Sequence, residues 1–184
     1  GAIPDVVLAV NGLPVATIEL KNPMSATRWN VENAKYQYRF ERDPKELLFI
    51  FKQRCLVHFA VDTELAFMTT KLEGKDTFFL PFNLGQNHGA GNPPAEGDVR
   101  TGYLWQKVLT RDSLMDILGR FMHLDVEEKT VVTEKGIKRH RKESMIFPRY
   151  HQLDSVRALT DHAERNGSGH NYLIKHSAGS GKSN

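Results

Sequence analysis

The first 21 residues constrain the fold of this chain more than any other stretch, because they form the pattern of a β-hairpin. Two apolar runs, Val6–Val10 and Leu13–Leu20, are joined at Asn11-Gly12. Asn-Gly between two apolar runs is the strongest short-range signal of a hairpin. The sequence therefore predicts a β-sheet that begins close to the first residue.

Three charged residues interrupt this hairpin: Asp5 before the first strand, and Glu19 and Lys21 near the end of the second. Side chains alternate between the two sides of a strand, so Glu19 and Lys21 share one side and Leu20 is expected to point into the core. Charges beside buried strands cost desolvation energy unless a cation or a reaction uses them. The three side chains are therefore a candidate site.

The loop of the hairpin decides whether Asp5 joins the other two charges. A two-residue Asn11–Gly12 loop would pair Asp5 with Ile18 and turn it away from Glu19, so such a loop would count against the site. A three-residue loop with a bulge at Gly12 pairs Asp5 with Thr17 and places it on the side of Glu19. We therefore expect a bulged, three-residue loop.

The residue types at this site favour Mg²⁺. Two carboxylates, Asp5 and Glu19, suit an ion that takes few protein ligands and keeps its waters for a phosphate. Lys21 could orient or deprotonate an attacking water and stabilise the developing charge. Pro4-Asp5 followed by Glu19-Leu20-Lys21 resembles the motif of the PD-(D/E)xK nucleases. The alternative is an amphipathic hairpin whose charges simply face solvent.

Composition sets broad limits on the function. The chain has 184 residues, 40% hydrophobic and 26% charged, a net charge of +3, and a single cysteine, Cys55. These values are typical of a soluble globular protein, permit a polyanionic partner, and exclude an intrachain disulfide. The apolar runs are too short to span a membrane, so we expect no membrane partner and a cytoplasmic location. We also expect the sequence to be part of a longer protein.

Several elements are expected between residues 22 and 124. A helix is predicted over 31–41, with Ala34, Gln37, Tyr38 and Glu41 on one face. Strands are predicted at Leu47–Phe51, Cys55–Asp62 and Leu65–Leu72. A second helix is predicted over 113–123, with Asp112 as its N-cap. Its apolar side chains lie on one face that is expected to be buried: Leu114, Ile117, Leu118 and Phe121. His58 is expected in the core. His88 and Asn92 are expected in the long surface loop 84–101.

A basic cluster lies between residues 135 and 142, and its members include Lys138, Arg139, Arg141 and Lys142. Runs of charge are mostly solvated linkers or hairpins. The same residues could contact the phosphates of DNA, which would give sequence-independent and salt-dependent affinity. We expect a linker or β-ribbon over 125–146, with possible DNA contacts from these four residues.

A second signature follows the basic cluster. A helix is predicted from about residue 150 to Glu164 and a strand at Asn171–Lys175, followed by His176-Ser177-Ala178-Gly179-Ser180-Gly181-Lys182-Ser183. A strand that runs into a glycine-rich turn and Gly-Lys-Ser is typical of a phosphate-binding loop. In such a loop Gly179, Ser180 and Gly181 cradle phosphates, Lys182 reaches their oxygens and Ser183 ligates Mg²⁺. The first glycine of the full motif is replaced by His176.

Taken together, these motifs resemble the restriction (R) subunit of type I restriction-modification enzymes. The resemblance also rests on Gln37-Tyr38-Arg39, Phe79–Asn83 and Phe147–Gln152. It implies an α/β fold with a central mixed sheet flanked by helices at 1–124, a basic linker or ribbon at 125–146, and the start of a RecA-like motor domain at 147–184.

The same resemblance implies the residue roles. Asp5 and Glu19 would be metal ligands, Lys21 catalytic, and Gln37 the glutamine of a Q-x-x-x-Y motif whose tyrosine position holds Glu41. Gln152 would read adenine, with Phe147 or Arg149 against the base.

The activity implied is Mg²⁺-dependent cleavage of unmodified double-stranded DNA, coupled in the full protein to ATP-driven translocation. The partners implied are DNA and the modification and specificity subunits. Two alternatives stay open: a catalytically silent DNA-binding module, and a subunit-docking platform attached to a P-loop ATPase.

Overall fold

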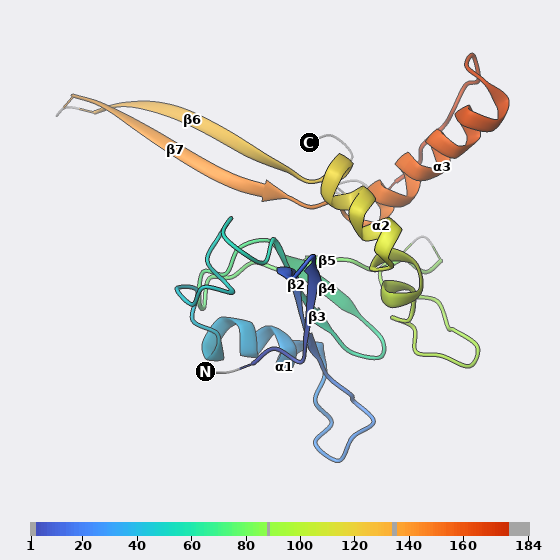
Figure 1. Cartoon of the computed structure of the whole chain (residues 1–184), viewed down its shortest axis with the longest axis horizontal. Helices are drawn as coiled ribbons and strands as arrows, with labels where there is room; N and C mark the ends of the chain where they lie inside the picture. The colour runs from blue at the N-terminus through green and yellow to red at the C-terminus, as the bar shows by residue number, and fades with distance from the viewer. Residues whose placement is uncertain (1–2, 88, 134–135, 177–184) are drawn as a thin grey trace.

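A five-stranded mixed sheet forms the centre of the molecule (Figure 1). The computed structural model describes residues 3–87, 89–133 and 136–176, with the backbone alone at 129, 131–133 and 136–140. The strands are β1 (Val6–Val10), β2 (Leu13–Leu20), β3 (Val57–Val61), β4 (Ala66–Thr69) and β5 (Leu80–Pro81), in this order across the sheet. Only the β2–β3 pair is parallel. The predicted α/β class with a mixed sheet is confirmed.

The first hairpin has a different loop from the one predicted. Asn11 and Gly12 both have positive φ angles, 49° and 82°, and Val10 pairs with Leu13, so the loop has two residues. The predicted three-residue loop is wrong. The irregularity lies further along, where Ala9 pairs with Pro14 but Leu8 pairs with Ala16.

The extra residue in the second strand is therefore Val15, and the bulge shifts the register of everything beyond it. Proline has no N–H to give to a ladder, which explains why regular pairing fails beside Pro14. Val6 pairs with Ile18, so the register, extended by one residue, places Asp5 opposite Glu19. Asp5 and Glu19 therefore lie on one side of the hairpin, as predicted. The bulge that places them there is in the second strand and not in the loop.

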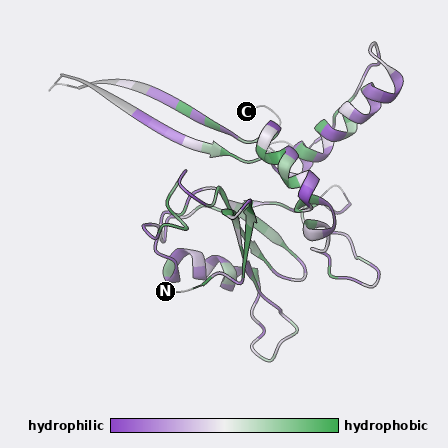
Figure 2. Cartoon of the chain, in the orientation of Figure 1, coloured by the Kyte–Doolittle hydropathy of each residue, from purple (hydrophilic) through white to green (hydrophobic). Residues whose placement is uncertain are grey.

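Each side of the sheet has its own hydrophobic core. One side carries Ile18, Phe59 and Met68 and is covered by η2 (Leu104–Val108), α2 (Arg111–Asp116) and η3 (Ile117–Phe121). The other side carries Ala60 and is covered by α1 (Val31–Tyr36) and η1 (Gln37–Glu41). Figure 1 shows α1 below the sheet and α2 above it, and Figure 2 shows hydrophobic colour concentrated in the strands between them.

The helix predicted over 31–41 is present as α1 and η1. The Asn30 side chain accepts from the Glu32 N–H and caps its first turn. Its last part is wound as a π-helix, with the Arg42 N–H donating to the Gln37 carbonyl at 3.0 Å. The helix predicted over 113–123 is also present, as α2 and η3, but it begins after Thr110. Asp112 lies in its first turn, so the predicted cap is wrong.

Three further expectations are corrected. Residues 47–51 form turns where a strand was predicted, because the chain there leads up to β3 without a partner strand. Leu20 is 42% exposed and does not reach the core, because it lies beyond the helices that cover Ile18. Asn92 is buried and bonds the loop together through Leu84, Asn83 and the Glu64 carbonyl. His88 lies outside the described residues.

A long two-stranded ribbon, β6 (His123–Thr133) paired with β7 (Gly136–Ile146), projects from the body of the molecule (Figure 1). Its base is held on the rest of the chain: Lys52 pairs with Glu143, and the Thr70 hydroxyl donates to the Met145 carbonyl at 2.8 Å. The sequence left a linker or a β-ribbon open for 125–146, and the structure has the ribbon.

Helix α3 (Tyr150–Asn166) follows the ribbon and ends at Gly167, whose φ is 78°. Phe147 and Leu153 are buried in the same core as Phe59, so the beginning of this segment packs on the sheet. Residues 171–175 form no strand, contrary to the sequence prediction, since no neighbouring strand pairs with them among the described residues. The start of a RecA-like domain stays a prediction. Among the described residues, no helix has both the length and the apolar character that crossing a membrane requires.

Candidate active site

The hairpin brings Asp5, Glu19 and Lys21 together at one end of β1 and β2. The Lys21 ammonium lies 3.7 Å from Asp5 Oδ2, and the Leu20 N–H donates to that same oxygen at 2.8 Å. The Lys21 side chain is only 8% exposed, whereas that of Asp5 is 44% exposed. Asp5 therefore faces solvent beside a largely buried lysine. Both charges act on Glu19: Asp5 raises its pKa and Lys21 lowers it.

Glu19 is fully buried and forms an ion pair with Arg42. The guanidinium Nε donates to Oε1 at 2.8 Å, and Nη2 lies 2.6 Å from the same oxygen as an ion-pair contact. Burial raises the pKa of Glu19 above its ordinary value, and the hydrogen bond and charge of Arg42 oppose that rise. The second carboxylate oxygen, Oε2, is buried and has no hydrogen-bond partner among the described residues.

The donor set fits a hard divalent cation. A buried carboxylate oxygen without a partner is rare in proteins, and coordination of a cation would satisfy it. Asp5 supplies a second carboxylate on the solvent side of the hairpin. Among the described residues, no group of three or more His, Cys, Asp or Glu side chains is arranged to hold a metal. Two carboxylates with water in the remaining positions are consistent with Mg²⁺.

Gln37 lies on η1, and its Oε1 is a second buried oxygen without a hydrogen-bond partner among the described residues. No hydrogen bond joins Gln37 to Asp5, Glu19 or Lys21 in the part of the chain that the structure describes. Glu41, predicted on the same face, is exposed. The π-winding explains this result. In a π-turn the residue that lies above Gln37 is five positions later and not four. Arg42 therefore takes the buried position, and Glu41 is turned to solvent.

A buried polar network lies next to the acids on the same side of the sheet. The Thr17 hydroxyl shares hydrogen bonds with the Tyr38 hydroxyl, at 2.8 Å, and with His58 Nδ1, at 2.7 Å. Burial lowers the pKa of His58 to about 3, so the ring is neutral at physiological pH. His58 is therefore a core histidine, as predicted. Burial also raises the pKa of Tyr38, so neither group is poised to exchange protons near pH 7.

Two residues near the site were missed from the sequence. Arg42 has no role in the sequence predictions, because nothing in the residues around it indicates that it is buried beside an acid. Trp29 lies with its ring centroid 5.6 Å from the Lys21 ammonium, at a distance typical of cation–π contacts. No spacing rule connects Trp29 to Lys21, so only the fold reveals that contact.

The basic cluster lies on β7, where acids of β6 face part of it. Glu127 is opposite Lys142 and Glu128 is opposite Arg141, and Arg141 also pairs with Glu143 at 3.0 Å. Lys138 and Arg139 instead lie opposite Val131 and Thr130, nearer the far end of the ribbon. The basic residues of β7 that have no acid opposite them in register therefore lie toward the far end of the ribbon.

Two depressions lie outside the hairpin. A groove of about 1110 Å³ runs between the ribbon base and the sheet. Its charged lining is balanced between cations and anions: Lys71, Arg141, Lys142 and Arg149 against Glu73, Asp125, Glu127 and Glu143. This balance gives the groove no net attraction for a polyanion such as DNA.

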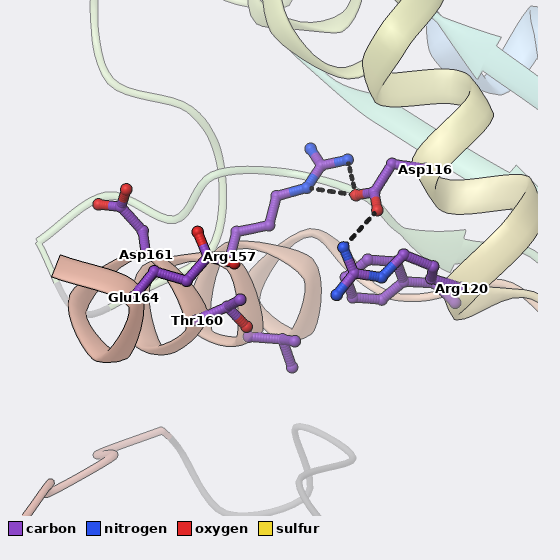
Figure 3. Close-up of a pocket in the computed structure, with 8 residues that line it drawn as sticks. Asp116, Arg120, Arg157, Thr160, Asp161 and Glu164 are labelled. Carbon is purple, nitrogen blue, oxygen red and sulfur yellow. Dashed lines mark hydrogen bonds and ion pairs between the residues drawn. The ribbon is translucent and has the colours of Figure 1, made fainter. Parts of the chain in front are cut away.

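The smaller depression, of about 260 Å³, lies between η3 and α3 (Figure 3). Arg157 donates to Asp116 Oδ2 from Nε and Nη2, at 3.1 and 2.8 Å, and to the Ser113 hydroxyl at 2.9 Å. Arg120 lies 3.4 Å from the other oxygen of Asp116. These charges satisfy one another and hold α3 against α2, so the depression is a helix-packing contact.

The nucleotide-binding residues predicted from the sequence are only partly described. Gln152 Oε1 accepts from the Arg149 N–H at 2.9 Å and thereby caps the start of α3. Phe147, proposed to lie against a base, is buried against Phe59 and Phe82. That role for Phe147 is therefore wrong. Gly179, Ser180, Gly181, Lys182 and Ser183 lie outside the described residues.

Comparison with known proteins shows which class of protein the hairpin region resembles. Residues 1–77 match the family model described as "Type I restriction enzyme R protein N terminus". This part of the chain, which contains the hairpin, α1, η1, β3 and β4, is therefore similar to the N-terminal region of type I restriction enzyme R proteins.

A particular relative extends the similarity to nearly the whole chain. The match is 24% identical over 184 residues, 98% of this chain, to a Methanocaldococcus jannaschii protein named "Putative type I restriction enzyme MjaVIIIP endonuclease subunit". The chain spans 16% of the length of that relative. No solved structure matches the chain.

Proposed function

We propose that this chain is the nuclease-bearing part of a restriction subunit and that it cleaves unmodified double-stranded DNA with Mg²⁺. The observation that carries the proposal is the buried Oε2 of Glu19, which lies near Asp5 and Lys21 and has no hydrogen-bond partner in the part of the chain that the structure describes. This arrangement lies within the stretch that matches the R protein N-terminal family.

Each residue has a role that follows from its surroundings. Asp5, on the solvent side, and Glu19 Oε2, on the buried side, would hold the ion, which when bound lowers the pKa of a water and screens phosphate charge. Lys21, held beside Asp5 and over Trp29, would stabilise negative charge that develops on the scissile phosphate. Gln37 would lie beside this site and position a water or the DNA backbone.

We further propose that the ribbon contributes to DNA binding through its far end. Lys138 and Arg139 have no acid opposite them in register, whereas Glu128 and Glu127 of β6 lie opposite Arg141 and Lys142, and Arg141 also forms an ion pair with Glu143. Phosphate contacts from such residues add affinity that does not depend on sequence and weakens with salt.

The setting proposed for the whole protein follows from its family. ATP would bind at Gln152 and at Gly179–Ser183 and drive translocation along DNA, the modification and specificity subunits would be partners, and the complex would work in the cytoplasm.

One experiment tests the nuclease directly. The full-length protein, assembled with its modification and specificity subunits, is given unmodified plasmid DNA, ATP and Mg²⁺, and cleavage is followed on gels. Asp5→Asn and Glu19→Gln should each abolish cleavage while ATP hydrolysis and DNA binding persist. Full cleavage by both variants would refute the proposed site.

A second candidate function is a silent nuclease-like module that only grips DNA. The ion pairs support it, since Arg42 already neutralises Glu19 and Lys21 already neutralises Asp5. In that case the wild-type assembly would bind DNA without cutting it, and calorimetry would detect no Mn²⁺ binding to the wild-type protein.

A further inference from the structure

We propose that Arg42 is a positioning residue that fixes Glu19 so that one defined carboxylate oxygen is presented to the divalent ion. The inference rests on the proposed metal-dependent function of the hairpin and adds to it the residue that orients its buried acid. The Arg42 and Glu19 side chains are 4% and 0% exposed. They are contributed by separate elements, η1 with the turn after it and β2.

The geometry of this pair differs from that of an ion pair that only stabilises a fold. Arginine and a carboxylate commonly meet as two forks, with one N–H on each oxygen. Here Nε donates to Oε1 and Nη2 contacts the same oxygen, and Oε2 is left buried without a hydrogen-bond partner among the described residues. One carboxylate oxygen is thus held by Arg42, and the other is left for the divalent ion.

Arg42 also reaches the strand that carries the other acid. Its Nη2 lies 3.4 Å from the Ile3 carbonyl, two residues before Asp5. A single guanidinium therefore contacts the buried acid of β2 and the chain that leads into Asp5. This placement allows Arg42 to set the spacing between the two carboxylates as well as the orientation of one.

The π-winding of η1 delivers Arg42 to this position. The Arg42 N–H closes the last turn on the Gln37 carbonyl, five residues earlier. Tyr38 and Arg42 then lie on the buried face, while Glu41 is turned outward. Single π-turns inside helices are frequent at functional sites, and this turn also carries the unpartnered Oε1 of Gln37.

The side chain itself limits what can replace it. A guanidinium presents several donors in one rigid plane, whereas a lysine ammonium is a point charge on a flexible stem. Lysine at this position would keep the charge beside Glu19 but would not hold the carboxylate between two nitrogens of one rigid plane. Orientation and charge are therefore separable by substitution.

The test measures Mn²⁺ binding to the full-length protein, with no DNA present, by calorimetry and by electron paramagnetic resonance. The variants are Arg42→Lys, Arg42→Met and the control Arg39→Met, and circular dichroism confirms that each is folded. Arg39 belongs to the same turn, but its Nε donates to the Thr77 carbonyl, away from the acids. The Mn²⁺ binding that is lost in Glu19→Gln is the binding that belongs to this site.

Substituting a side chain that orients a metal ligand weakens metal affinity roughly 10–100-fold. We expect that loss for Arg42→Met, a smaller but clear loss for Arg42→Lys, and wild-type affinity for Arg39→Met. Wild-type or tighter Mn²⁺ binding by Arg42→Lys would overturn the inference even if Arg42→Met failed to fold.

The outcomes separate this inference from the function on which it rests. If the wild-type protein binds Mn²⁺ and Glu19→Gln does not, the metal site stands and the arginine variants decide the role of Arg42. If the wild-type protein binds no Mn²⁺, the proposed metal site and the role of Arg42 are both refuted.

Discussion

The molecule contains two charged β-hairpins that differ in how far their charged side chains are buried. In the β1–β2 hairpin, Glu19 is fully buried, Lys21 nearly so, and a helix lies across them. In the β6–β7 ribbon, acids and bases face one another across exposed strands, as Glu127 faces Lys142. The ribbon is far richer in charge, but its acidic and basic residues are nearly equal in number.

The difference shows that the cost of a charge is a better guide to function than the number of charges. Exposed ion pairs contribute little to stability and are screened by salt. A buried charge is retained only when it is paired or used, because desolvating it costs several kcal/mol. The short hairpin, with three charges, is therefore the stronger candidate for chemistry.

The largest expected effect compares one acid from each hairpin. Glu19→Ala leaves the buried Arg42 guanidinium without its partner and should lower the free energy of unfolding by about 3–5 kcal/mol. Glu143→Ala removes exposed pairs with Lys52 and Arg141 and should cost far less. Urea denaturation measures both. Equal losses of unfolding free energy in the two variants would contradict the proposed difference between the hairpins.

The next effect compares two lysines in cleavage. Lys21→Ala should slow DNA cleavage by the assembled full-length protein roughly 100–1000-fold, since it removes a charge positioned at the reacting phosphate. Lys142→Ala, on the ribbon opposite Glu127, should leave the rate within a few-fold of wild type. The measurement is the single-turnover rate of plasmid cutting. A Lys142 effect as large as that of Lys21 would argue that the ribbon is the active element.

A smaller effect concerns pH and the polar network behind the hairpin. Burial holds the pKa of His58 at about 3, whereas an unfolded histidine titrates near 6.5. Below pH 6.5 the unfolded state therefore binds the extra proton. The stability that neutral His58 contributes is complete above that pH and falls by about 1.4 kcal/mol per pH unit as the pH drops toward 3.

His58→Gln should remove this part of the pH dependence of unfolding, measured by urea titration between pH 4 and 8. Phe49→Leu is the control, since Phe49 packs beside the His58 ring but does not titrate. It should lower stability equally at every pH. An unchanged pH profile in His58→Gln would show that the ring is protonated within the fold or that other groups dominate.

The smallest effect concerns the ribbon and salt. Replacing Arg139, which lies opposite Thr130, with Ala should reduce the slope of log affinity for DNA against log salt by about 1, as expected for one lost phosphate contact. Lys142→Ala should change that slope less, because Glu127 lies opposite it. Equal slopes for both variants would refute the proposed division of the ribbon.

Local patterns in the sequence determined much of this protein. The Asn11–Gly12 hairpin, the helix over 31–41, the core position of His58 and the ribbon after residue 123 all follow from short-range rules. The sequence also singled out Asp5, Glu19 and Lys21, since strand alternation and unpaired charge are visible without a fold.

Only the tertiary structure decided how those residues meet. The register depended on a bulge at Val15, beside Pro14, which has no N–H to give to the ladder. The partner of Glu19 depended on a π-turn that turned Glu41 outward and brought Arg42 inward. Both are long-range outcomes, because burial on a shared face, and not local propensity, selects the side chains that contact each other.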